Sequence, residues 1–147
     1  MATGLQGAVN EAVLLCSSVL AASDVDVHIQ GHETDVWVEP GSLQQVLVNL
    51  IQNAVDALQS ASQRRLVFDV ERVGDVARLR VSDTGSGMTP EAMQKLFDRG
   101  FSTKGDNRGL GLSSCRRLVE GMGGTLQGSS DGPGLGACFE LTLPGPE

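Results

Sequence analysis

A long amphipathic helix is predicted from Pro40 to Ser60. Proline is well tolerated in the first turn of a helix, so Pro40 marks its beginning. On a helix that advances about 100° per residue, the apolar side chains fall on a single stripe. That stripe consists of Leu43, Val46, Leu47, Leu50, Ala54 and Leu58. Because only one stripe is apolar, the helix requires a second layer of structure to pack against.

The order of the other expected elements predicts an α+β fold. Residues 7–22 have the apolar spacing of a helix, and several short segments alternate as strands do. The expected strands are 25–29, 35–39, 66–72, 76–82, 126–129 and 137–143, and two further helices are expected at 90–97 and from 109–112 to about 121. This order favours a two-layer α/β sandwich in which helices cover one face of a mixed sheet.

Length and composition are those of one soluble domain, residues 1–147. Only 3% of the residues are aromatic, so the core must consist mainly of Leu, Val, Ile and Ala. No stretch approaches the ~20 apolar residues of a membrane span, and the N-terminus lacks the pattern of a signal peptide. We therefore expect a cytoplasmic domain, and leave open whether the full-length protein is membrane-anchored.

The three cysteines, Cys16, Cys115 and Cys138, are odd in number and far apart. Their spacing matches no zinc motif, because there is no CxxC and no Cys/His pattern. We interpret them as reduced thiols of the core.

The charge of the chain is unevenly distributed. The net charge of −7 argues against nucleic acid as a partner. Residues 95–117, however, carry six cations and only two acids. A basic segment in an acidic protein suggests a local site for a polyanion, although a solvated charged face would look the same.

Polar residues lie along one flank of the Pro40–Ser60 helix. Asn49, Asn53, Asp56 and Ser60 fall within a wedge of roughly 60°. Short oxygen-bearing side chains at this spacing could help to bind Mg²⁺, which usually keeps several waters and phosphate oxygens as ligands. The same pattern also fits a solvated helix edge that happens to be rich in asparagine.

An acid followed by two glycines ends the expected strand 76–82. In the segment Asp83-Thr-Gly85-Ser-Gly87-Met88, a fixed carboxylate could accept a hydrogen bond from the exocyclic amine of adenine. Guanine would present an acceptor at that position, which is unfavourable. Glycine would let the backbone approach the base. As a bare pattern this is weak, because ordinary turns have it too.

A second glycine pair, Gly109-Leu110-Gly111-Leu112, precedes the last expected helix. Exposed N–H groups at a helix start can bind phosphates. The segment is neither a Walker A loop nor a dinucleotide fingerprint, and alone it also fits a simple helix start.

Taken together and in this order, the motifs resemble the GHKL superfamily of ATP-binding domains, and specifically the histidine kinases. The resemblance covers about residues 35–144. Within the histidine kinases, the sequence is most similar to the nitrogen-regulation and dicarboxylate-sensing branch. Four boxes carry it: Asn49-Leu-Ile-Gln-Asn53-Ala-Val-Asp56-Ala57, Asp83-Thr-Gly-Ser-Gly-Met88, Leu96-Phe-Asp-Arg-Gly-Phe-Ser-Thr-Lys104 and Gly109-Leu-Gly-Leu112. The fold that the resemblance implies is the Bergerat ATP-binding fold.

The resemblance also implies roles for individual residues. Asn53 would coordinate Mg²⁺ with support from Asn49, and Asp83 would recognise the adenine of ATP. The glycine boxes and the lid would supply the other nucleotide contacts: Gly85, Gly87, Met88, Phe97, Phe101, Thr103, Lys104, Arg108, Gly109, Leu110, Gly111 and Leu112. Among these, Lys104 would offset phosphate charge, and Phe97 and Phe101 would anchor the lid by packing. The role of Asp56 stays open.

One position bears on the type of reaction. Related ATPases carry a glutamate four residues before the Mg²⁺-binding asparagine, where it acts as general base, whereas this chain has Asn49. An amide cannot take up the proton, so hydrolysis loses a contribution of typically 10²–10⁴-fold. Phosphoryl transfer needs mainly positioning and charge neutralisation. We therefore expect a protein-histidine kinase, rather than a nucleotide-binding regulatory module or a protein serine kinase.

The phosphoacceptor is expected outside this chain. Neither His28, in an expected strand, nor His32, in an expected turn, has the helical His-Glu/Asp context of the acceptor. The resemblance implies that residues 1–24 connect to a dimerisation domain that carries this histidine, and that a response regulator is an indirect partner. In isolation, we expect the domain to be monomeric.

Overall fold

The computed structural model describes residues 2–96 and 112–145 of the chain. Within these residues, the centre of the fold is a five-stranded sheet with the strand order β2-β4-β5-β7-β6. Strand β2 runs parallel to β4, and the other neighbours are antiparallel. The sheet is therefore mixed, as predicted. Its strands are β2 (Asp26–Gly31), β4 (Arg65–Val73), β5 (Val76–Asp83), β6 (Thr125–Ser129) and β7 (Ala137–Pro144).

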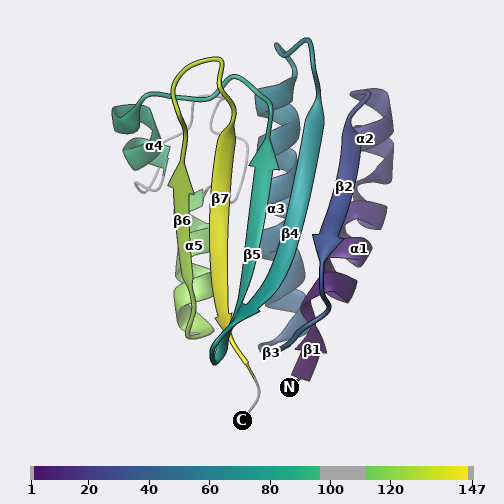
Figure 1. Ribbon diagram of the computed structural model, residues 1–147, viewed down its shortest axis with the longest axis vertical. Coiled ribbons are helices and arrows are strands. Elements are labelled where there is room, and N and C mark those ends of the chain that lie inside the picture. The colour runs from purple at the N-terminus through teal and green to yellow at the C-terminus, as the bar shows by residue number, and fades with distance from the viewer. Residues whose placement is uncertain (1, 97–111, 146–147) are drawn as a thin grey trace.

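Helices cover one face of this sheet (Figure 1). They are α1 (Leu5–Leu15), α2 (Ser17–Ala22), α3 (Pro40–Leu58) and α5 (Leu112–Gly121); the short α4 (Pro90–Leu96) lies near β6. Alternate residues of each inner strand point toward the helices, as the twofold period of a strand requires. The two-layer α+β arrangement predicted from the sequence is thus confirmed.

Helix α3 is the central element of the helical layer. Its apolar stripe is buried, and the buried set is wider than the predicted one: Leu43, Val46, Leu47, Leu50, Ile51, Ala54, Val55 and Leu58. Each leucine, isoleucine or valine side chain in this set contributes about 1.5–3 kcal/mol when it is fully buried. The carboxylate of Glu39 accepts a hydrogen bond from the backbone N–H of Ser42 and so caps the start of the helix. The helix ends at Leu58 rather than Ser60.

The N-terminal segment is part of the same core. Two helices, α1 and α2, replace the single predicted helix, because the backbone departs from helical geometry at Cys16. Leu5, Val9 and Leu20 are nevertheless buried on one side of both helices. The carboxylate of Glu33 accepts hydrogen bonds from the N–H groups of Gln6 (2.6 Å) and Gly7 (2.9 Å) and so caps α1 from a distant part of the chain.

A second, two-stranded sheet involves the chain terminus. Strand β1 (Ala2–Gly4) pairs antiparallel with β3 (Asp35–Trp37). Strands β2 and β3 follow one another in the chain but belong to different sheets.

The cysteine prediction is correct for two of the three residues. Cys16 and Cys115 are buried, and all three thiols are free. Cys138 is half-buried on the open face of β7, because it alternates with the inward-facing Ala137 and Phe139. Among residues 2–96 and 112–145, no helix has both the length and the hydrophobicity of a transmembrane span.

Candidate functional site

The candidate site lies at one end of the sheet, where β5 ends beside α3 and the β6–β7 connection (top of Figure 1). Asp83 is the last residue of β5, and its position in the strand alternation directs it to the helical side. The residue is only 8% exposed. The backbone N–H of Gly85 donates to Oδ1 of Asp83 at 2.9 Å. Burial at the end of β5 and the hydrogen bond from the backbone therefore hold the Asp83 carboxylate in a fixed position.

The electrostatic environment of Asp83 is dominated by burial. Loss of solvent raises the pKa of the carboxyl above its ordinary value, since burial disfavours the charged form. Hydrogen bonds from the backbone N–H groups of Gly85 and Ala137 oppose this rise in pKa. Gly85 follows β5 and Ala137 begins β7, so two neighbouring strands fix the same carboxylate.

The loop that follows Asp83 packs tightly on the C-terminal end of α3. The N–H of Ser86 donates to the carbonyl of Ala57 at 2.9 Å. A Cβ atom on Gly85 would lie 2.6 Å from that carbonyl oxygen and 2.8 Å from Oδ1 of Asp83. Glycine is therefore required at position 85 by contact with the protein itself. Whether Gly85 also shapes the space under a base, as the resemblance implies, stays a prediction.

Residues 130–136 cover the opposite side of this loop. The N–H of Gly134 donates to the carbonyl of Ser86 at 2.6 Å, and that of Gly136 to the carbonyl of Gly85 at 3.2 Å. Gly87 has a φ of +60°, and a Cβ there would lie 2.2 Å from the carbonyl oxygen of Gly132. The sequence reasoning missed this segment, although its glycine-rich composition just before a strand was a usable signal.

The polar flank of α3 lies on the helix as predicted. Asn49, Asn53 and Asp56 are all half-buried. The side-chain amide of Asn49 donates to Sγ of the buried Cys115 at 3.5 Å, which links α3 to α5. Burial raises the pKa of the Cys115 thiol, although the hydrogen bond from Asn49 lowers it in part. Cys115 is thus a neutral packing residue behind the flank. Ser60 lies beyond the end of the helix.

A hollow of about 660 Å³ opens beside Asp83. This volume is in the range of small-molecule sites. Leu135, which is 66% exposed, lies at its edge. The lining residues are Ser60, Ala61, Ser62, Gln63, Asp83, Thr84, Gly85, Ser86, Gly134 and Leu135.

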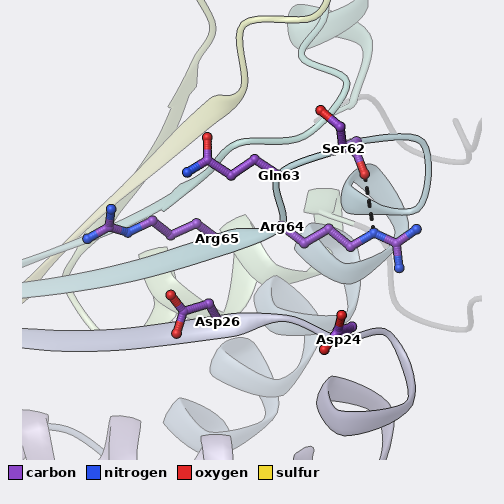
Figure 2. Close-up of a pocket in the computed structure, with 7 residues that line it drawn as sticks. Asp24, Asp26, Ser62, Gln63, Arg64 and Arg65 are labelled. Atoms are coloured by element: carbon purple, nitrogen blue, oxygen red, sulfur yellow. Dashed lines mark hydrogen bonds between the residues drawn. The ribbon is translucent and has the colours of Figure 1, made fainter.

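A second hollow, of about 680 Å³, lies on the other side of residues 61–63 and is shown in Figure 2. One of the two arginines that line it, Arg64, is held by hydrogen bonds from all three of its guanidinium nitrogens. The guanidinium donates to the carbonyls of Ser23 (2.7 Å), Gln59 (2.8 Å) and Ala61 (3.3 Å). Two acids, Asp24 and Asp26, line the opposite side. Arg64 is therefore a structural cap for the ends of α2 and α3, and the two acids balance the charge of Arg64 and Arg65, so the hollow carries no excess of positive charge for a polyanion.

Several predicted site residues lie outside the described part of the chain. They are Phe97, Phe101, Thr103, Lys104, Arg108, Gly109, Leu110 and Gly111. Leu112 is described: it begins α5 and is buried. The structure therefore brings together Asp83, the first glycine pair and the end of α3, and the predictions for the lid rest on the resemblance alone.

Comparison with known proteins identifies the family. The sequence model described as histidine kinase-, DNA gyrase B-, and HSP90-like ATPase matches residues 38–147. Sensor protein FixL of Bradyrhizobium diazoefficiens is 36% identical over 144 residues, which are 97% of this chain and 26% of FixL. The C4-dicarboxylate transport sensor protein DctS of Rhodobacter capsulatus is 37% identical over 123 residues, or 81% of this chain and 18% of DctS. This chain thus spans about a quarter or less of the length of these relatives.

Solved structures show the same fold. The nucleotide-free catalytic domain of histidine kinase ThkA superposes with a TM-score of 0.83 at 25% identity, covering all of this chain and 98% of that one. The mycobacterial sensor histidine kinase MprB, at 21% identity, has the same TM-score of 0.83 and supports the fold alone. Both comparisons agree with the mixed sheet and one-sided helical layer described above. From the family match and the shared fold, the chain belongs to the histidine kinase-, DNA gyrase B-, and HSP90-like ATPase family of ATP-binding domains.

Proposed function

We propose that this chain binds Mg²⁺-ATP beside Asp83 and transfers the γ-phosphoryl group to a histidine on a separate dimerisation domain. The observation that carries the proposal is the Asp83 carboxylate, which is buried at a strand end and held by the N–H groups of Gly85 and Ala137. A carboxylate fixed in this way can accept a hydrogen bond from the exocyclic amine of adenine. Guanine offers an acceptor there, so ATP is the expected nucleotide.

Asn53 is the residue that would hold Mg²⁺. It is half-buried on α3, four residues from Asn49 and thus one turn along the same flank. Its amide oxygen is the type of hard ligand that Mg²⁺ accepts, and this ion typically needs only one or two protein ligands beside phosphate oxygens and waters. When bound, the ion neutralises charge that develops on the phosphates.

Asn49 favours transfer over hydrolysis. Its side chain is an amide that donates to Sγ of Cys115, and no carboxylate stands at this position. Activation of water would lose the general-base contribution of typically 10²–10⁴-fold. A domain that presents the γ-phosphoryl to an external nucleophile does not need that base, because catalysis rests on positioning and electrostatics.

The proposed protein partners are inferred from the relatives and from one solved complex. FixL and DctS are sensor proteins, and histidine kinase ThkA has been solved in complex with the response regulator protein TrrA. We infer a dimerisation domain with the acceptor histidine as the direct partner and a response regulator as an indirect one. Residues 1–24 would lead to the dimerisation domain, and Lys104 of the lid would offset phosphate charge.

Calorimetry on the purified chain tests nucleotide binding. We expect Mg²⁺-ATP to bind more tightly than Mg²⁺-GTP, and Asp83→Asn to bind Mg²⁺-ATP more weakly than wild type. Asp75→Asn is the matched control, since Asp75 is exposed in the turn between β4 and β5. Equal affinity for the two nucleotides, or undiminished ATP binding by the Asp83 variant, would contradict the site.

A transfer assay tests the reaction. The chain is incubated with [γ-³²P]ATP and a purified dimerisation domain, and we expect acid-labile label on the histidine. Acid-stable label would indicate a serine kinase instead. ATP binding without any label on the partner would indicate a regulatory nucleotide-binding module.

A further inference from the structure

We propose that Ser130 is a positioning residue for the nucleotide site: its hydroxyl holds the loop Gly85–Met88 in place and thereby sets the affinity for ATP without contacting the nucleotide. The inference rests on the proposed function, since it assigns Ser130 to that same site. Ser130 follows β6, 47 residues after Asp83, and belongs to none of the motifs that the sequence singled out.

The Ser130 hydroxyl uses all of its hydrogen-bonding capacity on backbone groups. It accepts from the N–H of Met88 at 3.1 Å and from the N–H of Gly132 at 3.2 Å. It donates to the carbonyl of Gly136 at 2.6 Å, and the carbonyl of Gly132 lies 3.2 Å away as a second acceptor. A hydroxyl has one donor and two acceptor positions, so this arrangement satisfies it completely.

These bonds join two segments that are distant in the sequence. Met88 ends the glycine box that begins at Asp83, whereas Gly132 and Gly136 belong to the β6–β7 connection. Two further hydrogen bonds between the two segments are backbone to backbone: Gly134 N–H to the Ser86 carbonyl and Gly136 N–H to the Gly85 carbonyl. Among the described residues, Ser130 thus supplies the side-chain link between them.

The link reaches the carboxylate that recognises adenine in the proposed function. Gly136 has a φ of +75°, and a Cβ there would lie 2.2 Å from the carbonyl oxygen of Asp83. The next residue, Ala137, donates its N–H to the Asp83 carboxylate. The hydroxyl that holds the Gly136 carbonyl therefore positions both the loop after Asp83 and a backbone donor to its side chain.

Removal of the hydroxyl should loosen the loop before it unfolds the domain. Ser130→Ala would leave the N–H of Met88 without its partner, while the sheet and α3 keep their own hydrogen bonds and core. The disordered loop would then have to be ordered on binding, and that cost would weaken ATP binding. If Ser130 only supported the turn structurally, Ser130→Ala would lower the free energy of unfolding, but the fully folded variant would bind ATP with wild-type affinity.

The test compares Ser130→Ala and Ser130→Cys with wild type, at a temperature where unfolding curves show all three fully folded. The cysteine variant keeps a polar group at this position, but its sulfur is larger than the hydroxyl oxygen and is only a weak donor and acceptor. We expect the Kd for ATP to rise by about 3- to 10-fold for alanine and less for cysteine. In the transfer assay, KM for ATP should rise with kcat unchanged. Ser129→Ala, an exposed neighbour at the end of β6, is the matched control and should bind like wild type.

Amide hydrogen exchange gives an independent readout without nucleotide. The Met88 amide should exchange faster in Ser130→Ala than in wild type, whereas core amides such as that of Leu79 should not change. Wild-type ATP affinity in the alanine variant would overturn the inference, whether or not the Met88 amide exchanged faster, and would leave the proposed function intact. If the wild-type chain itself failed to bind ATP, the proposed function would fail, but the exchange experiment would still report whether Ser130 holds the loop.

Discussion

The backbone N–H of Gly85 donates to Oδ1 of Asp83 at 2.9 Å, two residues back along the chain. This contact is possible because residue 85 has no Cβ, which would lie 2.8 Å from the same oxygen. The acid and the glycine therefore form one unit: the glycine lets the loop fold back over the carboxylate, and the carboxylate fixes the start of the loop.

Replacement of Asp83 by asparagine should weaken ATP binding by about 10- to 100-fold, because a hydrogen bond to a charged group contributes about 1.5–3 kcal/mol. It should also erase the preference for ATP over GTP, since asparagine carries both a donor and an acceptor. Titration calorimetry with both nucleotides measures the two effects. A retained preference for ATP would assign adenine recognition to another residue.

The same variant should be more stable than wild type at neutral pH. Burial raises the pKa of Asp83 in the folded state, so the charged carboxylate costs folding free energy whenever it is ionised. That cost is absent below the ordinary pKa of an aspartate and grows as the pH rises through the raised folded-state pKa. The Tm advantage of Asp83→Asn should therefore be largest at pH 7 and shrink toward pH 4. An advantage independent of pH would contradict the raised pKa.

Gly85→Ala should destabilise the fold by about 1–3 kcal/mol, because the new Cβ would collide with the carbonyl of Ala57 and with Asp83. Urea unfolding measures this difference. Gly121→Ala, at the end of α5, is the control: its Cβ would meet nothing within 4 Å, so the change should be neutral or slightly stabilising. A neutral result at position 85 would show that the loop can move away from α3.

Asn53→Asp should lower Mg²⁺-ATP affinity by at least about 10-fold, because a carboxylate would place negative charge beside the phosphates. Gln52→Glu adds the same charge one residue away on an exposed position of α3 and should have little effect. Calorimetry across a series of Mg²⁺ concentrations compares the two variants. Equal losses would point to a general charge effect rather than to a site at Asn53.

The three cysteines should react at different rates with an alkylating reagent in the native protein. Burial raises the pKa of the Cys16 and Cys115 thiols, which lowers the fraction of reactive thiolate, whereas Cys138 is half-buried on the open face of the sheet. Mass spectrometry after timed labelling should find Cys138 modified first. Early modification of Cys115 would contradict its packing between α3 and α5.

The sequence alone predicted most of the helices and strands, although it gave α1 and α2 as one helix and missed β1. Periodicity is a short-range property, so the stripe of α3 and the alternation of β4 and β5 were readable without coordinates. The Asp83 motif was also readable, because all of its residues are adjacent in the chain.

How those elements meet was visible only in the folded chain. The parallel pairing of β2 with β4, the capping of α1 by Glu33 and the attachment of Met88 to Ser130 join residues that are 26 to 42 positions apart. Such contacts leave no periodic pattern, because each depends on where the whole chain brings a single polar group. For that reason a sequence pattern predicted the Asp83 carboxylate, but only the structure revealed what holds it in place.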